Sequence, residues 1–138
     1  MATTSGYSGT PLHAKLGLKP GVSATFLSAP TGYRARLGAL PAVTVRRDAR
    51  GGRALDLIQL FTKRRRELET RLPALKRALA PAGALWISWP KRASGVTTDL
   101  TEDVIRAVAL SHGLVDVKVC AIDAVWSGLK LVRRLKDR

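Results

Sequence analysis

The feature that most restricts the fold is a pair of apolar runs, 55–61 (LDLIQLF) and 84–89 (ALWISW), separated by a helical pattern over 62–80. The apolar positions of this helix recur at spacings of three and four: Leu68, Leu72, Leu75 and Leu79. That spacing makes one apolar stripe, which a helix packs against a core. Nearly continuous apolar strands are typical of parallel sheets covered on both faces. We therefore expect a parallel sheet with this helix packed on it, kinked or restarted at Pro73.

Strand and helix signals alternate along the rest of the chain as well. They predict helices at 10–17, 31–38 and 99–112, and strands at 22–29, 43–45, 114–122 and 125–133. Asp99 is the predicted N-cap of the helix that ends at Gly113, with Glu102 as the reciprocal half of a capping box. The link between the last two strands is so short that it indicates an antiparallel hairpin.

These elements predict an α/β, Rossmann-like fold: a mostly parallel sheet with helices on both faces and an antiparallel C-terminal hairpin. One connection is tight. Residues 48–54 reach only about 23–25 Å when extended, which barely crosses a sheet. Either a stretched loop crosses here, or the strand at 43–45 is an edge strand that runs the other way.

The chain has 138 residues, which favours one domain over 10–138 after an N-terminal arm at 1–9. A single cysteine, Cys120, excludes an internal disulfide and a cysteine-rich zinc site. The first ten residues have no apolar core of a signal peptide, and no run approaches the ~20 apolar residues of a membrane span. We expect a cytoplasmic protein that does not bind membranes.

The formal net charge is +14, from 24 Lys and Arg against 10 Asp and Glu. A surplus of this size favours anionic partners. An anionic small molecule and an acidic protein are the expected partners. A nucleic acid is an alternative, although no helix-turn-helix, zinc-finger or aromatic ribonucleoprotein motif supports it.

The segment from Leu55 to Trp89 resembles the second half of a class I methyltransferase domain. It has an acid in an apolar strand (Asp56), then the helix end and break LKRALAPAG at 75–83, then the strand ALWIS. The closing pair of strands also resembles the C-terminal hairpin of that family. The resemblance implies the Rossmann-like fold, and S-adenosylmethionine as the cofactor of an active member.

The family's binding residues are only partly matched. An acid and a glycine-rich turn follow the first strand in that family, and the glycines let the backbone approach the methionine moiety of the cofactor. The matching stretch here, 27–32 (LSAPTG), has one glycine, no acid and a proline. The family also places an acid at the end of the second strand to hold the ribose hydroxyls, and Asp48 is the candidate for that role.

Over nearly its full length the chain also resembles a bacterial family of small proteins, a domain of unknown function. Three motifs carry this resemblance: SGYSGTPL at 5–12, LWISWPK at 85–91 and VWSGLK at 125–130. It implies the same fold and no established activity.

Ligands of open α/β sheets bind beyond the carboxyl ends of the parallel strands. Three predicted loops meet there and offer hydroxyls, helix N-terminal amides and cations, which suit an anion. The candidate ligand-binding residues are Thr31, Gly32, Tyr33, Thr62, Lys63, Trp89, Lys91 and Ser94.

No catalytic triad, pair of catalytic carboxylates, P-loop or metal-ligand spacing is present, so we expect no metal and assign no catalytic residue. The sequence alone therefore favours a non-catalytic binding module for an anionic small ligand or an acidic protein, with the cofactor unknown. A minimal or degenerate methyltransferase that uses S-adenosylmethionine, and a nucleic-acid-binding protein, are the alternatives.

Overall fold

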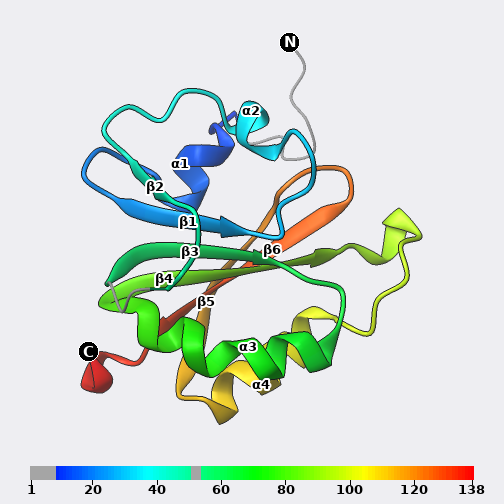
Figure 1. The fold of residues 1–138 in the computed structure, drawn as a ribbon. Helices are drawn as coiled ribbons and strands as arrows, with labels where there is room; N and C mark the ends of the chain where they lie inside the picture. Colours follow the sequence, from blue (N-terminus) through cyan, green and yellow to red (C-terminus); the bar gives the residue numbers. More distant parts are fainter. Residues whose placement is uncertain (1–8, 51–53) are drawn as a thin grey trace.

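The computed structural model describes residues 9–50 and 54–138, so residues 1–8 of the predicted arm lie outside the described residues. Figure 1 shows a sheet between two layers of helices, with α3 and α4 on one face and α1 and α2 on the other. The strands in spatial order are β2 (Thr44–Arg46), β1 (Ser23–Leu27), β3 (Leu55–Phe61), β4 (Leu79–Pro90), β6 (Trp126–Arg133) and β5 (Leu114–Ala121). The helices are α1 (Leu12–Leu16), α2 (Tyr33–Leu37), α3 (Arg65–Ala78) and α4 (Glu102–Ser111), with 3-10 turns η1 (Arg92–Ser94) and η2 (Leu135–Asp137).

Strands β2, β1, β3 and β4 are parallel, whereas β6 is antiparallel to both β4 and β5. The expected α/β, Rossmann-like fold with its C-terminal hairpin is therefore confirmed. Because β2 runs parallel to β1, the chain crosses β1 as a loop before entering β3 (Figure 1). Ala49 of this loop packs against the core on the side of α3 and α4. A stretched loop is thus the correct reading of the short connection.

Helix α3 packs its predicted stripe on the sheet, and Leu68, Leu72 and Leu75 are buried. The helix continues through Pro73 and ends at Ala78, two residues earlier than predicted. Leu79 lies at the start of β4, where it pairs with Leu55 and remains buried in the same core cluster.

Trp86 and Trp89 lie on opposite faces of β4, as their spacing in a strand predicts. The Trp86 indole N–H donates to the carbonyl of Leu16 at 3.0 Å, which fixes the end of α1 on the sheet. Gly128 of the neighbouring strand makes room for the indole, because a Cβ there would lie 3.2 Å from Trp86 Cε3 and 3.0 Å from Ile122 Cδ1. The backbone of the last strand therefore approaches Trp86 and Ile122 closely at Gly128.

A buried chain of polar side chains lies under α2. The Tyr33 hydroxyl donates to Gln59 Oε1 at 2.7 Å, and Gln59 Nε2 donates to Ser88 Oγ at 3.0 Å. Tyr33 also packs edge-on against Phe26 and Phe61. Burial raises the pKa of the Tyr33 phenol, because the charged form has lost its water.

The prediction that Asp99 caps α4 is wrong. Helix α4 begins at Glu102, and its N-cap is Thr101, whose hydroxyl accepts the N–H of Val104 at 3.2 Å. Asp99 Oδ1 instead accepts the N–H of Arg65, the first residue of α3, at 2.7 Å. A carboxylate is favourable there, because the helix N-terminus carries partial positive charge.

Replacing Tyr33 with Phe should lower the free energy of unfolding by about 1–3 kcal/mol, because Gln59 Oε1 loses its buried donor. The stability that the Tyr33 hydroxyl contributes to the wild type should also depend on pH. The unfolded tyrosine ionises near pH ~10, while the folded one ionises at higher pH. The contribution of Tyr33 is therefore complete below pH ~10 and falls as the pH rises further. Urea unfolding below and above that pH should show a steeper loss for the wild type than for Tyr33→Phe, and equal losses would contradict the buried phenol.

Replacing Asp99 with Ala should lower the free energy of unfolding by about 1 kcal/mol, because α3 loses the acceptor at its first N–H. Asp103 is a matched control, since its side chain is 92% exposed and pairs with Arg106 at the surface. Asp103→Ala should change stability by less than about 0.5 kcal/mol. Chemical denaturation of the two variants compares them, and an equal effect would mean that Asp99 does not cap α3.

Candidate functional site

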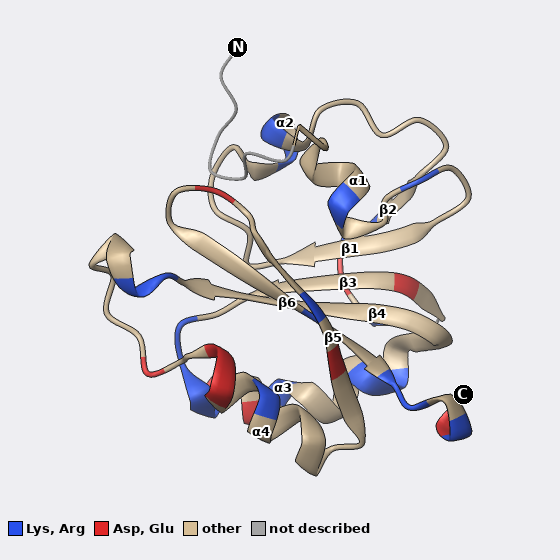
Figure 2. Ribbon diagram, turned by 180° about the vertical axis from the view of Figure 1, so that it is seen from behind, with Lys and Arg blue, Asp and Glu red and all other residues tan. Residues whose placement is uncertain are grey.

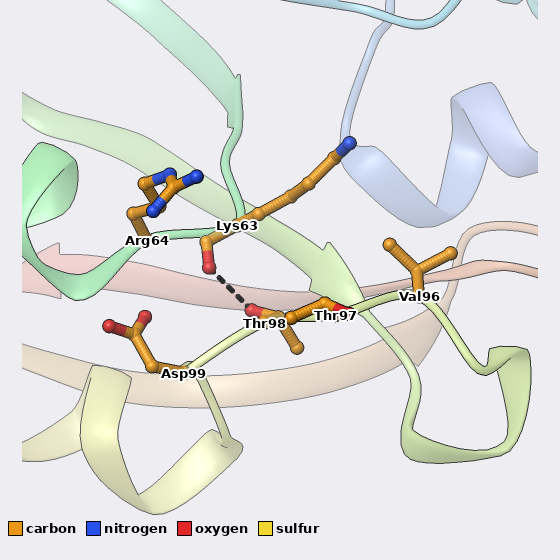
Figure 3. Close-up of a pocket in the computed structure, with 6 residues that line it drawn as sticks. All are labelled: Lys63, Arg64, Val96, Thr97, Thr98 and Asp99. Carbon is orange, nitrogen blue, oxygen red and sulfur yellow. Dashed lines mark hydrogen bonds between the residues drawn. The ribbon is translucent and has the colours of Figure 1, made fainter.

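An open pocket of about 430 Å³ lies at the carboxyl edge of the sheet, between the loops that follow β3 and β4. Its lining residues are Lys63, Arg64, Val96, Thr97, Thr98 and Asp99. In Figure 3 the Lys63 side chain extends away from Asp99. The pocket therefore has cations on the β3 side, and hydroxyls and one carboxylate on the β4 side.

A second open pocket of about 510 Å³ shares the segment 96–98 with the first. Trp89, Pro90, Leu100 and Arg92 contribute to its lining. Trp89 is only 7% exposed, so its indole forms an apolar wall rather than a protruding ring. The two pockets are neighbouring compartments on either side of one short segment of chain.

Hydrogen bonds join the two loops that form the first pocket. The Thr98 hydroxyl donates to the carbonyl of Lys63 at 2.6 Å, and the N–H of Asp99 donates to the same carbonyl at 3.3 Å (Figure 3). Together with the Asp99 carboxylate on the N–H of Arg65, they hold 98–99 against 63–65. The walls of this pocket are thus fixed relative to one another.

Three of the predicted ligand-binding residues lie in or beside these pockets at the β4 loop. Trp89 lines the second pocket. Ser94 Oγ donates to the carbonyl of Lys91 at 2.7 Å and accepts the N–H of Val96 at 3.1 Å. Lys91 and Ser94 therefore shape the turn that leads into the shared segment, and the Lys91 N–H is itself held by the carbonyl of Val125.

The other predicted residues are divided between the pocket, the core and the surface. Lys63 lines the first pocket. Thr62 and Tyr33 are buried, and Thr62 donates its hydroxyl hydrogen to Glu67 at the start of α3. Thr31 and Gly32 are exposed in the turn after β1, where Gly32 has a left-handed φ of 82°. Their roles in ligand binding stay predictions.

The segment from Val96 to Asp99, of which 96–98 line both pockets, contains none of the ligand-binding residues predicted from the sequence. The sequence places 90–98 in a loop and predicts a role only for Asp99, as an N-cap, because carboxylate side chains favour that position. The signal in the sequence was the excess of polar side chains before the helix, since one helix needs only one N-cap. Thr101 caps α4, and the Thr98 hydroxyl joins the loop at Lys63 instead.

Asp48, the candidate for the ribose hydroxyls, lies two residues beyond β2 in the loop that crosses the sheet. Its Oδ1 accepts the N–H of Arg50 at 2.9 Å, which holds the half-buried carboxylate in place. Because β2 pairs in parallel with β1, the end of β2 and the residues that follow it lie beside β1. Asp48 therefore lies just after the second strand, and its role at a ribose stays a prediction.

Two further observations concern reactive groups. Burial raises the pKa of the Cys120 thiol, which disfavours the nucleophilic thiolate. Within residues 9–50 and 54–138, no three His, Cys, Asp or Glu side chains are grouped to hold a metal ion. The same residues contain no helix long and apolar enough to cross a membrane.

Solved structures with this fold include methyltransferases. A SAM-dependent methyltransferase from Aquifex aeolicus is 16% identical, with a TM-score of 0.61 over 87% of this chain and 86% of that one. A protein described as a type 11 methyltransferase from Sulfolobus solfataricus is 15% identical, with a TM-score of 0.63 over 89% of both chains. A ribosomal protein L11 methylase from Lactobacillus delbrueckii subsp. bulgaricus is 15% identical, with a TM-score of 0.57 over 89% of this chain and 75% of that one. No protein-family model and no curated protein matches the chain.

These structural neighbours contradict the interpretation as a non-catalytic binding module for an anionic small ligand or an acidic protein. That interpretation rested on the absence of a recognised catalytic motif and on the glycine-poor turn at 27–32. Proteins described as methyltransferases instead match 87% and 89% of the chain, which favours the alternative of a minimal methyltransferase. At these identities the likeness shows the fold: the chain has the Rossmann-like fold of class I methyltransferases.

Proposed function

We propose that this chain is a methyltransferase of reduced size that uses S-adenosylmethionine, with its cofactor and its substrate at the carboxyl edge of the sheet. The observation that carries the proposal is the match to SAM-dependent methyltransferases over almost nine-tenths of the chain. The two neighbouring pockets support it, because they lie at the edge where open α/β sheets bind ligands.

The residues fit the ribose end of the cofactor. Asp48 is a carboxylate held by the N–H of Arg50 through one oxygen, and a carboxylate can accept from both hydroxyls of a ribose. In this proposal Asp48 binds the ribose, as the acid after the second strand does in the family that the chain resembles. The cofactor would supply a methyl group on a positively charged sulfur.

The turn after β1 does not fit the glycine-rich cradle of that family. Pro30 has no N–H to donate, and its carbonyl accepts the N–H of Tyr33. Two left-handed residues, Ser28 at a φ of 58° and Gly32 at 82°, flank the turn. We infer that side chains carry more of the cofactor binding here than backbone amides do, with Asp48 foremost.

The carboxylates nearest the pockets hold the protein together. Asp99 accepts the N–H of Arg65, and Glu102 pairs with Arg106. Among the residues that line the two pockets, these are the only carboxylates in the described part of the chain. The proposed enzyme therefore acts mainly by holding its substrate in position, an effect that can itself supply much of a rate enhancement.

Two further parts of the proposal rest on the sequence. The motifs at 5–12, 85–91 and 125–130 support membership of the small bacterial family described above. Action in the cytoplasm is a prediction from the sequence and is also part of the proposal.

Calorimetric titration with S-adenosylhomocysteine tests the proposal directly. The wild type should bind, and Asp48→Asn should weaken binding about tenfold or more, because hydrogen bonds to a charged group contribute about 1.5–3 kcal/mol. Asp103→Asn is the control, since Asp103 is exposed on α4, and it should bind like the wild type. An absence of heat with the wild type, together with no shift of its melting temperature, would refute the proposed function.

A further inference from the structure

Several cations gather at the carboxyl edge because of the sheet's topology. Lys63 and Arg64 follow β3, Lys91 and Arg92 follow β4, and Arg34 lies on α2, which follows β1. The carboxyl ends of these parallel strands lie at the same edge, and Figure 2 shows basic segments at the two loops and on α2. We call these five residues the basic edge.

The acidic groups near the basic edge are already engaged. The Asp99 carboxylate holds the N–H of Arg65, and Asp123 pairs with Arg36 at 2.8 Å. In the described part of the chain, no carboxylate lies within ion-pair distance of any basic-edge side chain. Their charge is therefore available to a ligand.

Cations near the opposite edge of the sheet have a structural role instead. The Arg133 guanidinium donates to the carbonyls of Leu79 and Ala80, and the Lys76 ammonium donates to the carbonyl of His112 at 2.7 Å. These contacts satisfy carbonyls at and just beyond the ends of α3 and α4, where positive charge is favourable. Arg133 and Lys76 thus hold the fold, whereas in the described part of the chain no carboxylate pairs with a side chain of the basic edge.

The two pockets lie among the cations of the basic edge. Lys63 and Arg64 line the first, and Arg92 lines the second. Pockets of about 430 and 510 Å³ have room for planar groups, and Trp89 and the Thr97 and Thr98 hydroxyls offer apolar and polar contacts. An aspartate or glutamate side chain carries its charge at its tip and would leave such pockets unfilled. A nucleotide places a planar base beside its phosphate and matches both features.

Resting on the proposed function, we propose that the methyl acceptor is a nucleic acid, which binds through its phosphates to the basic edge and places bases in the two pockets. The positive potential of a chain with a net charge of +14 would draw a polyanion to the protein. The positions of the basic edge and of the two pockets determine where the nucleic acid binds. Neutralised phosphates release counterions, so the binding should weaken steeply as salt increases.

The test measures the binding of a short labelled single-stranded RNA by fluorescence anisotropy, without any cofactor. Lys63→Gln combined with Arg64→Gln removes two cations from the basic edge. On a single strand each lost phosphate contact should reduce the slope of log K against log salt by about 0.7, so the slope should fall by about 1.4. At ~0.1 M salt the affinity should fall about 25-fold.

The matched control is Arg77→Gln combined with Lys136→Gln. It removes the same charge from exposed positions at the end of α3 and in η2. It should keep the wild-type slope. Equal losses in the two double variants would overturn the proposal, because binding would then follow net charge alone. Displacement of the RNA by poly-glutamate at equal charge concentration would also overturn it in favour of an acidic protein.

A second double variant, Lys91→Gln with Arg92→Gln, removes two other cations of the basic edge and should weaken RNA binding in the same way, so a local misfolding of the first variant would be recognised. The melting temperature of each variant is measured beforehand. Because the RNA titration contains no cofactor and the calorimetric titration contains no RNA, the two proposals fail separately. Binding of S-adenosylhomocysteine without RNA binding would leave a methyltransferase with another substrate. RNA binding without S-adenosylhomocysteine would retain the nucleic-acid surface and remove the enzyme.

Discussion

Strands β3 and β4 are buried on both faces, and the rest of the fold covers them. The leucine stripe of α3 and the inner side of α4 shield one face from water. Its apolar side chains include Ile58, Leu60, Leu85 and Ile87. Burial of such side chains contributes about 1.5–3 kcal/mol each, so neither face can be left open. In residues 9–50 and 54–138, the helices above the other face are α1 and α2, each five residues long. There, large aromatic side chains supply the area that the short helices lack.

The aromatic side chains on that second face surround a small group of buried polar residues. Tyr33, Phe61 and Trp126 contact one another edge to face, in a row from α2 across to β6. Gln59 and Ser88 lie within this region at 0% exposure, and they are tolerable because Tyr33 and Gln59 donate along one line of hydrogen bonds. The polar residues thus fix α2 over a particular point of the sheet. As a consequence Tyr33, which the sequence suggested as a ligand-binding residue, is buried in the core and holds Gln59.

Sequence patterns predicted the parts of the fold that follow a period or a strong break. LDLIQLF, the leucine stripe and the closing hairpin each have one physical interpretation, and the structure confirms them. The direction of β2 depended on whether a short loop could cross the sheet, which length alone left open. Asp99 was misassigned because its sequence suits a cap for the helix that follows, whereas its partner is the N–H of Arg65, distant in sequence. Pairing between loops has no local signature, so the position of the strand-end site could be predicted but not the segment 96–99 that lines it.

The contact between Trp86 and the end of α1 limits when α1 can dock on the sheet during folding. The first helix obtains its anchor only after β4 has been made, and the indole finds its seat only after Gly128 has entered the sheet. The two partners of this contact are 70 residues apart in sequence, so the earliest helix can dock through it only long after that helix has been synthesised. A nascent chain that lacks β6 would therefore have the indole in place but without the backbone of Gly128 beside it, so this face of the sheet closes last.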